Sequence, residues 1–160
     1  MLLLKVSILV HGCSIRSKLK QTNLARVLSI DYGVRRTGIA VTDPLQIIAG
    51  GLTTVQTHTL FDFLKDYFQK EPVERVVVGL PKQTNGRESE NYSRVQGFVK
   101  KFKSIYPEIP VELWDERYTS VLAHRTILDS GIGKKARQNK ELVDEVSAVI
   151  ILQGWMEARR

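Results

Sequence analysis

The run Val76-Val77-Val78-Gly79-Leu80 is the feature that most constrains how this chain can fold. Five consecutive apolar residues are typical of a β-strand that is covered on both faces. Such a strand lies inside a sheet with helices on both sides, so it predicts an α/β domain. Amphipathic patterns support this prediction, because apolar residues recur three and four apart over 58–70 and again over 89–106.

The order of the remaining patterns predicts how the sheet is connected. Three β-rich segments follow one another without a helix, which favours an antiparallel meander. The later strands alternate with helices, and right-handed crossovers would make them parallel. We therefore expect a five-stranded mixed sheet with helices on both faces. The predicted strands cover residues 26–31, 37–43, 51–55, 76–80 and 111–116, and the predicted helices cover about 58–70, 89–106, 119–129 and 140–159.

Composition excludes several classes of protein. The 160 residues are 42% hydrophobic and 26% charged, which is typical of one globular domain and excludes a disordered chain or a fibrous repeat. One cysteine cannot form an internal disulfide. The net charge is +7, of which residues 1–25 carry +4, so the rest of the chain supports an anionic partner only modestly.

Residues 1–25 differ from the rest of the chain. The apolar stretch Met1–Val10 has no basic segment ahead of it, is interrupted by Lys5, and is too short to span a bilayer. We interpret 1–25 as a disordered or non-native basic extension and 26–160 as the folded domain. We expect a cytoplasmic protein without a membrane partner, as a monomer or a weak dimer.

Acidic residues lie where two predicted strands end. Asp31 closes the first strand beside Gly33, which allows a sharp turn, and Asp115-Glu116 closes the fifth. Function in such sheets lies at the carboxyl ends of the central strands. The last helix adds Asp144 and Glu145, which periodicity alone does not separate.

The last predicted helix is apolar on most sides, so we expect it to be largely buried. A carboxylate on it needs a partner or a cation, because burying an unpaired charge is costly. Ser147 and Ala148 are small and share the face of Asp144, so they would let the helix approach the sheet.

Converging carboxylates repel one another unless a hard cation neutralises them. All-oxygen ligation suits Mg²⁺ or Mn²⁺ and not zinc, and no histidine or cysteine spacing typical of zinc is present. A carboxylate-held cation of this kind indicates phosphoryl chemistry.

Four motifs occur in order along the chain, at residues 29–40, 78–81, 115–120 and 143–153. Together they resemble the YqgF family of pre-16S rRNA nucleases, also called Holliday junction resolvase-like proteins. The resemblance extends from Arg26 to the C-terminus and implies an RNase H-like fold. It further implies a metal-dependent nuclease that matures the 5′ end of small-subunit ribosomal RNA.

The resemblance also implies the site residues. The family's three acids fall on Asp31, Glu116 and Asp144, as catalytic residues and as ligands of one or two Mg²⁺ or Mn²⁺ ions. Basic residues in three loops are predicted to bind the nucleic acid, although any one of them alone is more typical of a solvated surface. These residues are Arg35, Arg36, Lys82, Arg87, Lys134, Lys135 and Arg137. Turn or packing support is assigned to Gly33, Gly79, Pro81 and Ser147.

Three alternatives remain beside precursor rRNA cleavage. An Asp-x-Gly turn also opens sugar kinase and actin-type ATPases, but those need two such domains to enclose ATP. A non-catalytic nucleic-acid-binding domain is disfavoured by the presence of all three acids. A four-way DNA junction presents the same phosphates as RNA, and the sequence has no distinctive reader of the 2′-hydroxyl.

Overall fold

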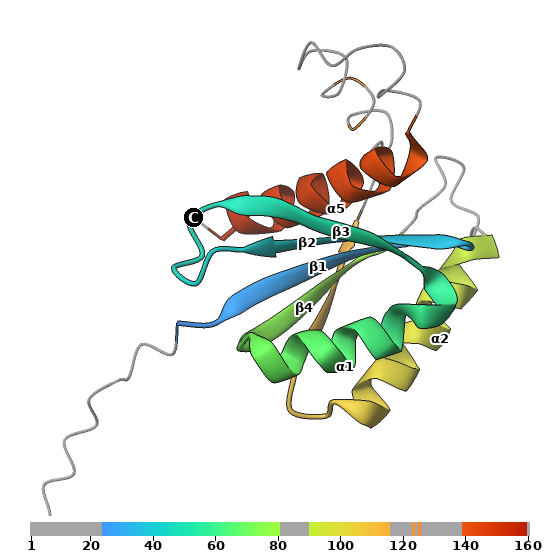
Figure 1. Ribbon diagram of the computed structural model, residues 1–160, viewed down its shortest axis with the longest axis horizontal. Helices are drawn as coiled ribbons and strands as arrows, with labels where there is room; N and C mark the ends of the chain where they lie inside the picture. The colour runs from blue at the N-terminus through green and yellow to red at the C-terminus, as the bar shows by residue number, and fades with distance from the viewer. Residues whose placement is uncertain (1–23, 81–89, 116–122, 124, 126–138, 160) are drawn as a thin grey trace, which may run out of the picture.

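The computed structural model describes residues 24–80, 90–115, 123, 125 and 139–159. These residues form a five-stranded sheet with helices packed against it (Figure 1). The elements are β1 (Arg26–Tyr32), β2 (Arg36–Thr42), β3 (Ala49–Gln56), the short 3₁₀ helix η1 (Thr57–Thr59), α1 (Leu60–Lys70), β4 (Val73–Leu80), α2 (Glu90–Ile105), β5 (Val111–Asp115) and α5 (Lys140–Glu157).

The sheet has the strand order β3-β2-β1-β4-β5, with β1 at its centre. β1 pairs antiparallel with β2, and β2 pairs antiparallel with β3. β4 lies parallel to both β1 and β5. The predicted mixed sheet, an antiparallel meander followed by parallel strands, is confirmed. Because β1, β4 and β5 are parallel, their carboxyl ends meet at one edge of the sheet.

Both faces of the central strands are buried, as the apolar run over 76–80 predicts. Val76 and Val78 belong to the core between the sheet and helices α1 and α2. Val77 points to the opposite face, where it packs with Ala148 and Leu152 of α5. Figure 1 shows this division, with α5 on one face of the sheet and α1 and α2 on the other. The prediction of helices on both faces is therefore confirmed.

The helices bury the side chains that their spacing indicates. α2 buries Val95, Phe98, Val99 and Phe102, and α1 buries Leu60 and Leu64. α5 buries one stripe that contains Ser147, Ala148, Ile151, Leu152 and Trp155. The rest of α5 is half-buried or exposed, so the helix is less enclosed than its composition predicts.

Two predicted segments fall largely outside the described residues. The predicted extension over 1–25 is described only at Leu24 and Ala25, and the predicted helix over 119–129 only at Ala123 and Arg125, both of which are helical. Among the helices that the structure does describe, none combines the length and apolarity needed to cross a membrane.

Candidate active site

Asp31 lies near the carboxyl end of β1, on the face of the sheet that α5 covers. Side chains alternate along β1. The Ser29 hydroxyl donates a hydrogen bond of 2.7 Å to the main-chain carbonyl of Ala148 on α5. Tyr32 points the other way and stacks on Phe98 of α2, with ring centroids 4.9 Å apart. Asp31 therefore shares the face of Ser29 and lies under the first half of α5.

A glycine on β2 sets how closely α5 approaches this point. Gly38 is the register partner of Asp31 in the β1–β2 pair. A Cβ atom at Gly38 would overlap the main-chain carbonyl of Asp144 and would contact Glu145 nitrogen at 3.0 Å. The helix backbone thus occupies the space that a side chain at residue 38 would need. This close approach brings Asp144 beside Asp31.

The two carboxylates interact electrostatically. The pKa of Asp31 is raised to about 7, chiefly by burial and further by the negative charge of Asp144. A hydrogen bond from the Ser147 side chain to Asp31 acts in the opposite direction, because it favours the ionised carboxylate. Asp31, Asp144 and Ser147 therefore form one electrostatic cluster built from β1 and α5.

Asp144 has a cationic partner in this cluster. The Nε atom of Arg36, the first residue of β2, donates to Asp144 Oδ2 at 2.8 Å. Both side chains are partly buried, with 29% of the Arg36 side chain and 26% of the Asp144 side chain exposed. The expectation that a carboxylate on this helix needs a partner or a cation is thus met by Arg36.

The two neighbouring acids of α5 point to different strands. Asp144 faces Asp31 and Arg36, whereas the Glu145 side chain covers Gly51 on β3, where a Cβ atom would lie 2.7 Å from Glu145 Cγ. Of these two acids, only Asp144 contributes to the raised pKa of Asp31, which is the distinction that periodicity alone could not make.

The turn between β1 and β2 is held in place by the 3₁₀ helix that follows β3. Thr57 donates its hydroxyl to Gly33 carbonyl at 2.8 Å, and its main-chain nitrogen donates to Arg35 carbonyl at 3.0 Å. A Cβ atom at Gly33 would overlap the carbonyl of Arg36. Close main-chain contact therefore requires glycine at residue 33. The turn also fixes the main-chain position of Arg36, whose side chain contacts Asp144.

Comparison with known proteins identifies the family. Residues 25–158 match the family model described as "RuvX: Holliday junction resolvase". The chain belongs to this RuvX family.

Relatives of this RuvX chain match well over half of its residues within the aligned region. Each of the following three aligns over 137 residues, which is 86% of this chain and 99% of the relative, and is named "Putative pre-16S rRNA nuclease". Identity is 58% for the protein from Bacteroides thetaiotaomicron, 59% for that from Phocaeicola vulgatus and 59% for that from Flavobacterium johnsoniae. A solved structure of T. thermophilus RuvC in complex with Holliday junction substrate aligns with a TM-score of 0.49 and 22% identity, over 84% of this chain and 95% of that chain.

The remaining predicted site residues of the RuvX chain divide into two groups. Within the described ranges, Gly79 is buried in β4, and Arg35 is exposed and lines a pocket of about 470 Å³ together with His58. The others, which stay predictions, lie outside the described residues: Glu116, Pro81, Lys82, Arg87, Lys134, Lys135 and Arg137. Among described residues alone, no three metal-ligating side chains form a cluster.

Sequence reasoning missed two features of the site. It did not single out Gly38, although a glycine inside a strand often marks a close main-chain approach. It also assigned Arg36 only to nucleic-acid binding, whereas its guanidinium contacts Asp144. An ion pair between residues 36 and 144 depends on the packing of α5 on β2, and no local pattern signals it.

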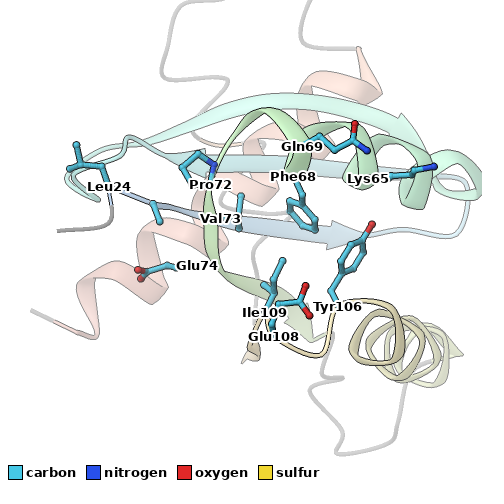
Figure 2. Close-up of a pocket in the computed structure, with 11 residues that line it drawn as sticks. Leu24, Lys65, Phe68, Gln69, Pro72, Val73, Glu74, Tyr106, Glu108 and Ile109 are labelled. Carbon is cyan, nitrogen blue, oxygen red and sulfur yellow. The ribbon is translucent and has the colours of Figure 1, made fainter. Parts of the chain in front are cut away.

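A cavity of about 990 Å³ lies at the other end of the sheet. Figure 2 shows the apolar side chains that line it, among them Phe68 of α1, Val73 of β4 and Tyr106 and Ile109 beyond α2. These residues surround the amino end of β4, whereas Asp31 lies near the carboxyl end of the parallel strand β1. No predicted site residue lines this cavity, so it is separate from the acidic cluster.

Proposed function

We propose that this chain is a metal-dependent nuclease that hydrolyses phosphodiester bonds of precursor 16S ribosomal RNA. The observation that carries this proposal is the pairing of Asp31 and Asp144, two acids 113 positions apart that the fold brings close enough for the charge of Asp144 to raise the pKa of Asp31. The names of the relatives supply the substrate class, and the described geometry supplies a chemistry that fits it.

The donor set of this cluster fits a hard divalent cation. Asp31 and Asp144 offer only carboxylate oxygens, and the raised pKa of Asp31 reflects unfavourable negative charge that a cation would relieve. We assign both acids as ligands of Mg²⁺ or Mn²⁺, with Glu116 as the third acid expected from the sequence. When bound, one or two such ions supply Lewis-acid stabilisation of phosphate charge and lower the pKa of water.

The chain's own residues would prepare this site. Ser147 donates to Asp31, which orients the carboxylate and favours its ionised form. Gly38 lets α5 carry Asp144 to the sheet. The basic residues predicted in the surrounding loops would bind the phosphates on either side of the bond to be cleaved. In this proposal the protein acts in the cytoplasm, where precursor rRNA is made in bacteria.

A four-way DNA junction is the second candidate substrate, because the family description names Holliday junction resolvase. RNA and DNA present the same phosphates, so the acidic cluster does not discriminate between them. The relatives of 57–59% identity favour the RNA substrate by their name.

A cleavage assay tests the proposal. The full chain is incubated with a precursor 16S rRNA fragment, a single-stranded DNA of matched sequence and a four-way DNA junction, each with Mn²⁺ or with EDTA. We expect Mn²⁺-dependent cleavage of the RNA and its loss in Asp31→Asn. Cleavage of the junction in preference to the RNA would favour the second candidate, and binding of RNA without cleavage would contradict a nuclease.

A further inference from the structure

We propose that the guanidinium of Arg36 occupies the place of a cation at Asp144 in the metal-free protein, and that a divalent ion must displace it. This inference rests on the proposed function, because it concerns the metal that the acidic cluster is proposed to hold. It makes Arg36 a positioning residue, which holds Asp144 until the metal ion binds.

The contact geometry supports an exchange of this kind. Arg36 Nε bonds to Asp144 Oδ2 at 2.8 Å, a charge-assisted hydrogen bond that engages one of the two carboxylate oxygens. Both side chains keep about a quarter of their surface exposed, so the guanidinium can leave the carboxylate toward solvent. A fully enclosed ion pair would not have this freedom.

The charges around Asp144 give the direction of the exchange. Asp31 and Asp144 repel one another when both are ionised, and the guanidinium at Asp144 partly compensates the pair. A divalent ion that binds both carboxylates compensates their charge more fully than one guanidinium does. However, the ion must compete with Arg36 for Asp144, and the positive charge of Arg36 repels it. Removing the guanidinium therefore favours metal binding on two counts.

The adjacent arginine offers a matched control. Arg35 carries the same charge one residue earlier, but it is exposed and lines a pocket beside His58, and its main-chain carbonyl is held by Thr57. Arg35→Gln and Arg36→Gln remove the same charge from adjacent positions, the end of the turn and the first residue of β2. A difference between the two variants thus reports the contact with Asp144 and not the net charge of the protein.

The experiment measures Mn²⁺ affinity of the full chain without nucleic acid, from the loss of the free Mn²⁺ signal in electron paramagnetic resonance. We expect Arg36→Gln to bind Mn²⁺ about three- to tenfold more tightly than wild type, the range for one partly exposed charge-assisted contact. Arg35→Gln should bind within about twofold of wild type, since exposed charges at a distance are screened by salt. Arg36→Lys, which keeps the charge but not the planar donor, should lie between wild type and Arg36→Gln.

If wild type binds Mn²⁺ and Arg36→Gln binds it with the same or weaker affinity, the exchange is overturned and the proposed function stands. An equal gain in Arg35→Gln would also overturn it. If Arg36→Gln does not fold, Arg36→Lys is compared with wild type instead, and an Mn²⁺ affinity no tighter than that of wild type would overturn the exchange. Wild type that fails to bind Mn²⁺, or binds it no better than Asp31→Asn, would overturn the proposed metal site and the exchange together.

Discussion

Asp31 is held in a setting that disfavours its charge. It is partly buried under α5, the charge of Asp144 lies nearby, and the hydrogen bond from Ser147 only partly offsets these effects on its pKa. Asp43, at the turn after β2, shows the opposite setting: its carboxylate accepts main-chain hydrogen bonds from Leu45, Ile47 and Ile48, which lower its pKa. Asp43 therefore stabilises a turn, whereas the setting of Asp31 fits the role of metal ligand that we propose for it.

Asp31→Asn should lose metal-dependent cleavage by orders of magnitude, while its metal-free form melts at the same temperature as wild type or slightly higher. The substitution removes one repelling charge at nearly constant shape. Mn²⁺ should raise the melting temperature of wild type more than that of the variant, because only a ligand of the folded state stabilises it. Melting curves with and without Mn²⁺ measure both effects.

Asp43→Asn is the control for this prediction. It should lower the melting temperature, because main-chain donors of the turn lose a charged acceptor, and it should leave the response to Mn²⁺ unchanged. An Asp31→Asn variant that instead behaves like Asp43→Asn would assign Asp31 a structural role.

The stability of the metal-free protein should depend on pH through Asp31. Its pKa is about 7 in the folded state against an ordinary value of 3.8, so protonation of Asp31 favours folding. This contribution is fully present below about pH 4 and is lost as the pH rises through about 7. The unfolding free energy of wild type should therefore fall relative to that of Asp31→Asn as the pH rises from 4 to 8.

Urea unfolding across this pH range in EDTA measures that difference. Ser147→Ala should move the transition to higher pH, because it removes the hydrogen bond that lowers the pKa of Asp31. A pH-independent difference between wild type and Asp31→Asn would show that Asp31 has a similar pKa in the folded and unfolded chain.

At the level of elements, α5 is the part whose position assembles the site. It packs across β1, β2 and β3, and three contacts fix its first half. The Ser29 hydroxyl bonds to Ala148 carbonyl at 2.7 Å, the Thr54 hydroxyl bonds to Glu141 carbonyl at 2.8 Å, and the helix backbone lies against Gly38. A small displacement of α5 would separate Asp144 from Asp31 and from Arg36.

Gly38→Ala should destabilise the fold by about 1–3 kcal/mol or more, because the new methyl group would overlap the main chain of Asp144, which cannot move aside as a side chain can. It should also weaken Mn²⁺ binding by shifting Asp144 away from Asp31. Urea unfolding and Mn²⁺ titration measure the two effects.

Gly97→Ala provides the comparison. Gly97 is exposed in α2 and nothing lies within 4 Å of a Cβ atom there, so alanine should stabilise the helix by about 0.5–1 kcal/mol without affecting Mn²⁺ binding. If Gly38→Ala were tolerated as well as Gly97→Ala, the close approach of α5 to β2 would not be what positions Asp144.

At the level of the whole molecule, the described core begins at residue 25. Ala25 is buried and its carbonyl accepts a hydrogen bond of 2.9 Å from Gln46, and Arg26 nitrogen donates to Pro72 carbonyl at 2.8 Å. Among the residues that the structure describes, those from Val27 onward form both layers of the core, one on each side of the sheet.

Deleting residues 2–23 should change the melting temperature by less than about 4 °C, which corresponds to less than about 1 kcal/mol. The deletion removes basic charge, so nonspecific RNA binding at low salt should weaken. Extending the deletion through Ala25 should lower the melting temperature further, because it removes a buried side chain and the acceptor for Gln46. A large loss on removing 2–23 alone would show that this segment is part of the fold.

The order of strands and helices, the two-sided burial of 76–80 and the position of Asp31 at a strand end follow from the sequence, because hydrophobic periodicity is a local property. For the elements whose bounds the structure describes, the predicted boundaries agree to within about three residues, for the same reason. The sequence also marked Ser147 and Ala148 as small residues on the face of α5 that meets the sheet, and the structure buries both.

Only the tertiary structure decided how the acidic cluster is arranged. The choice of Asp144 over Glu145 as the neighbour of Asp31, the ion pair with Arg36 and the need for glycine at residue 38 all depend on where α5 lies on the sheet. Asp31, Arg36 and Gly38 each lie more than 100 residues before Asp144 in the chain. Contacts over such separations result from close packing of whole elements, and no pattern confined to one strand or helix encodes them.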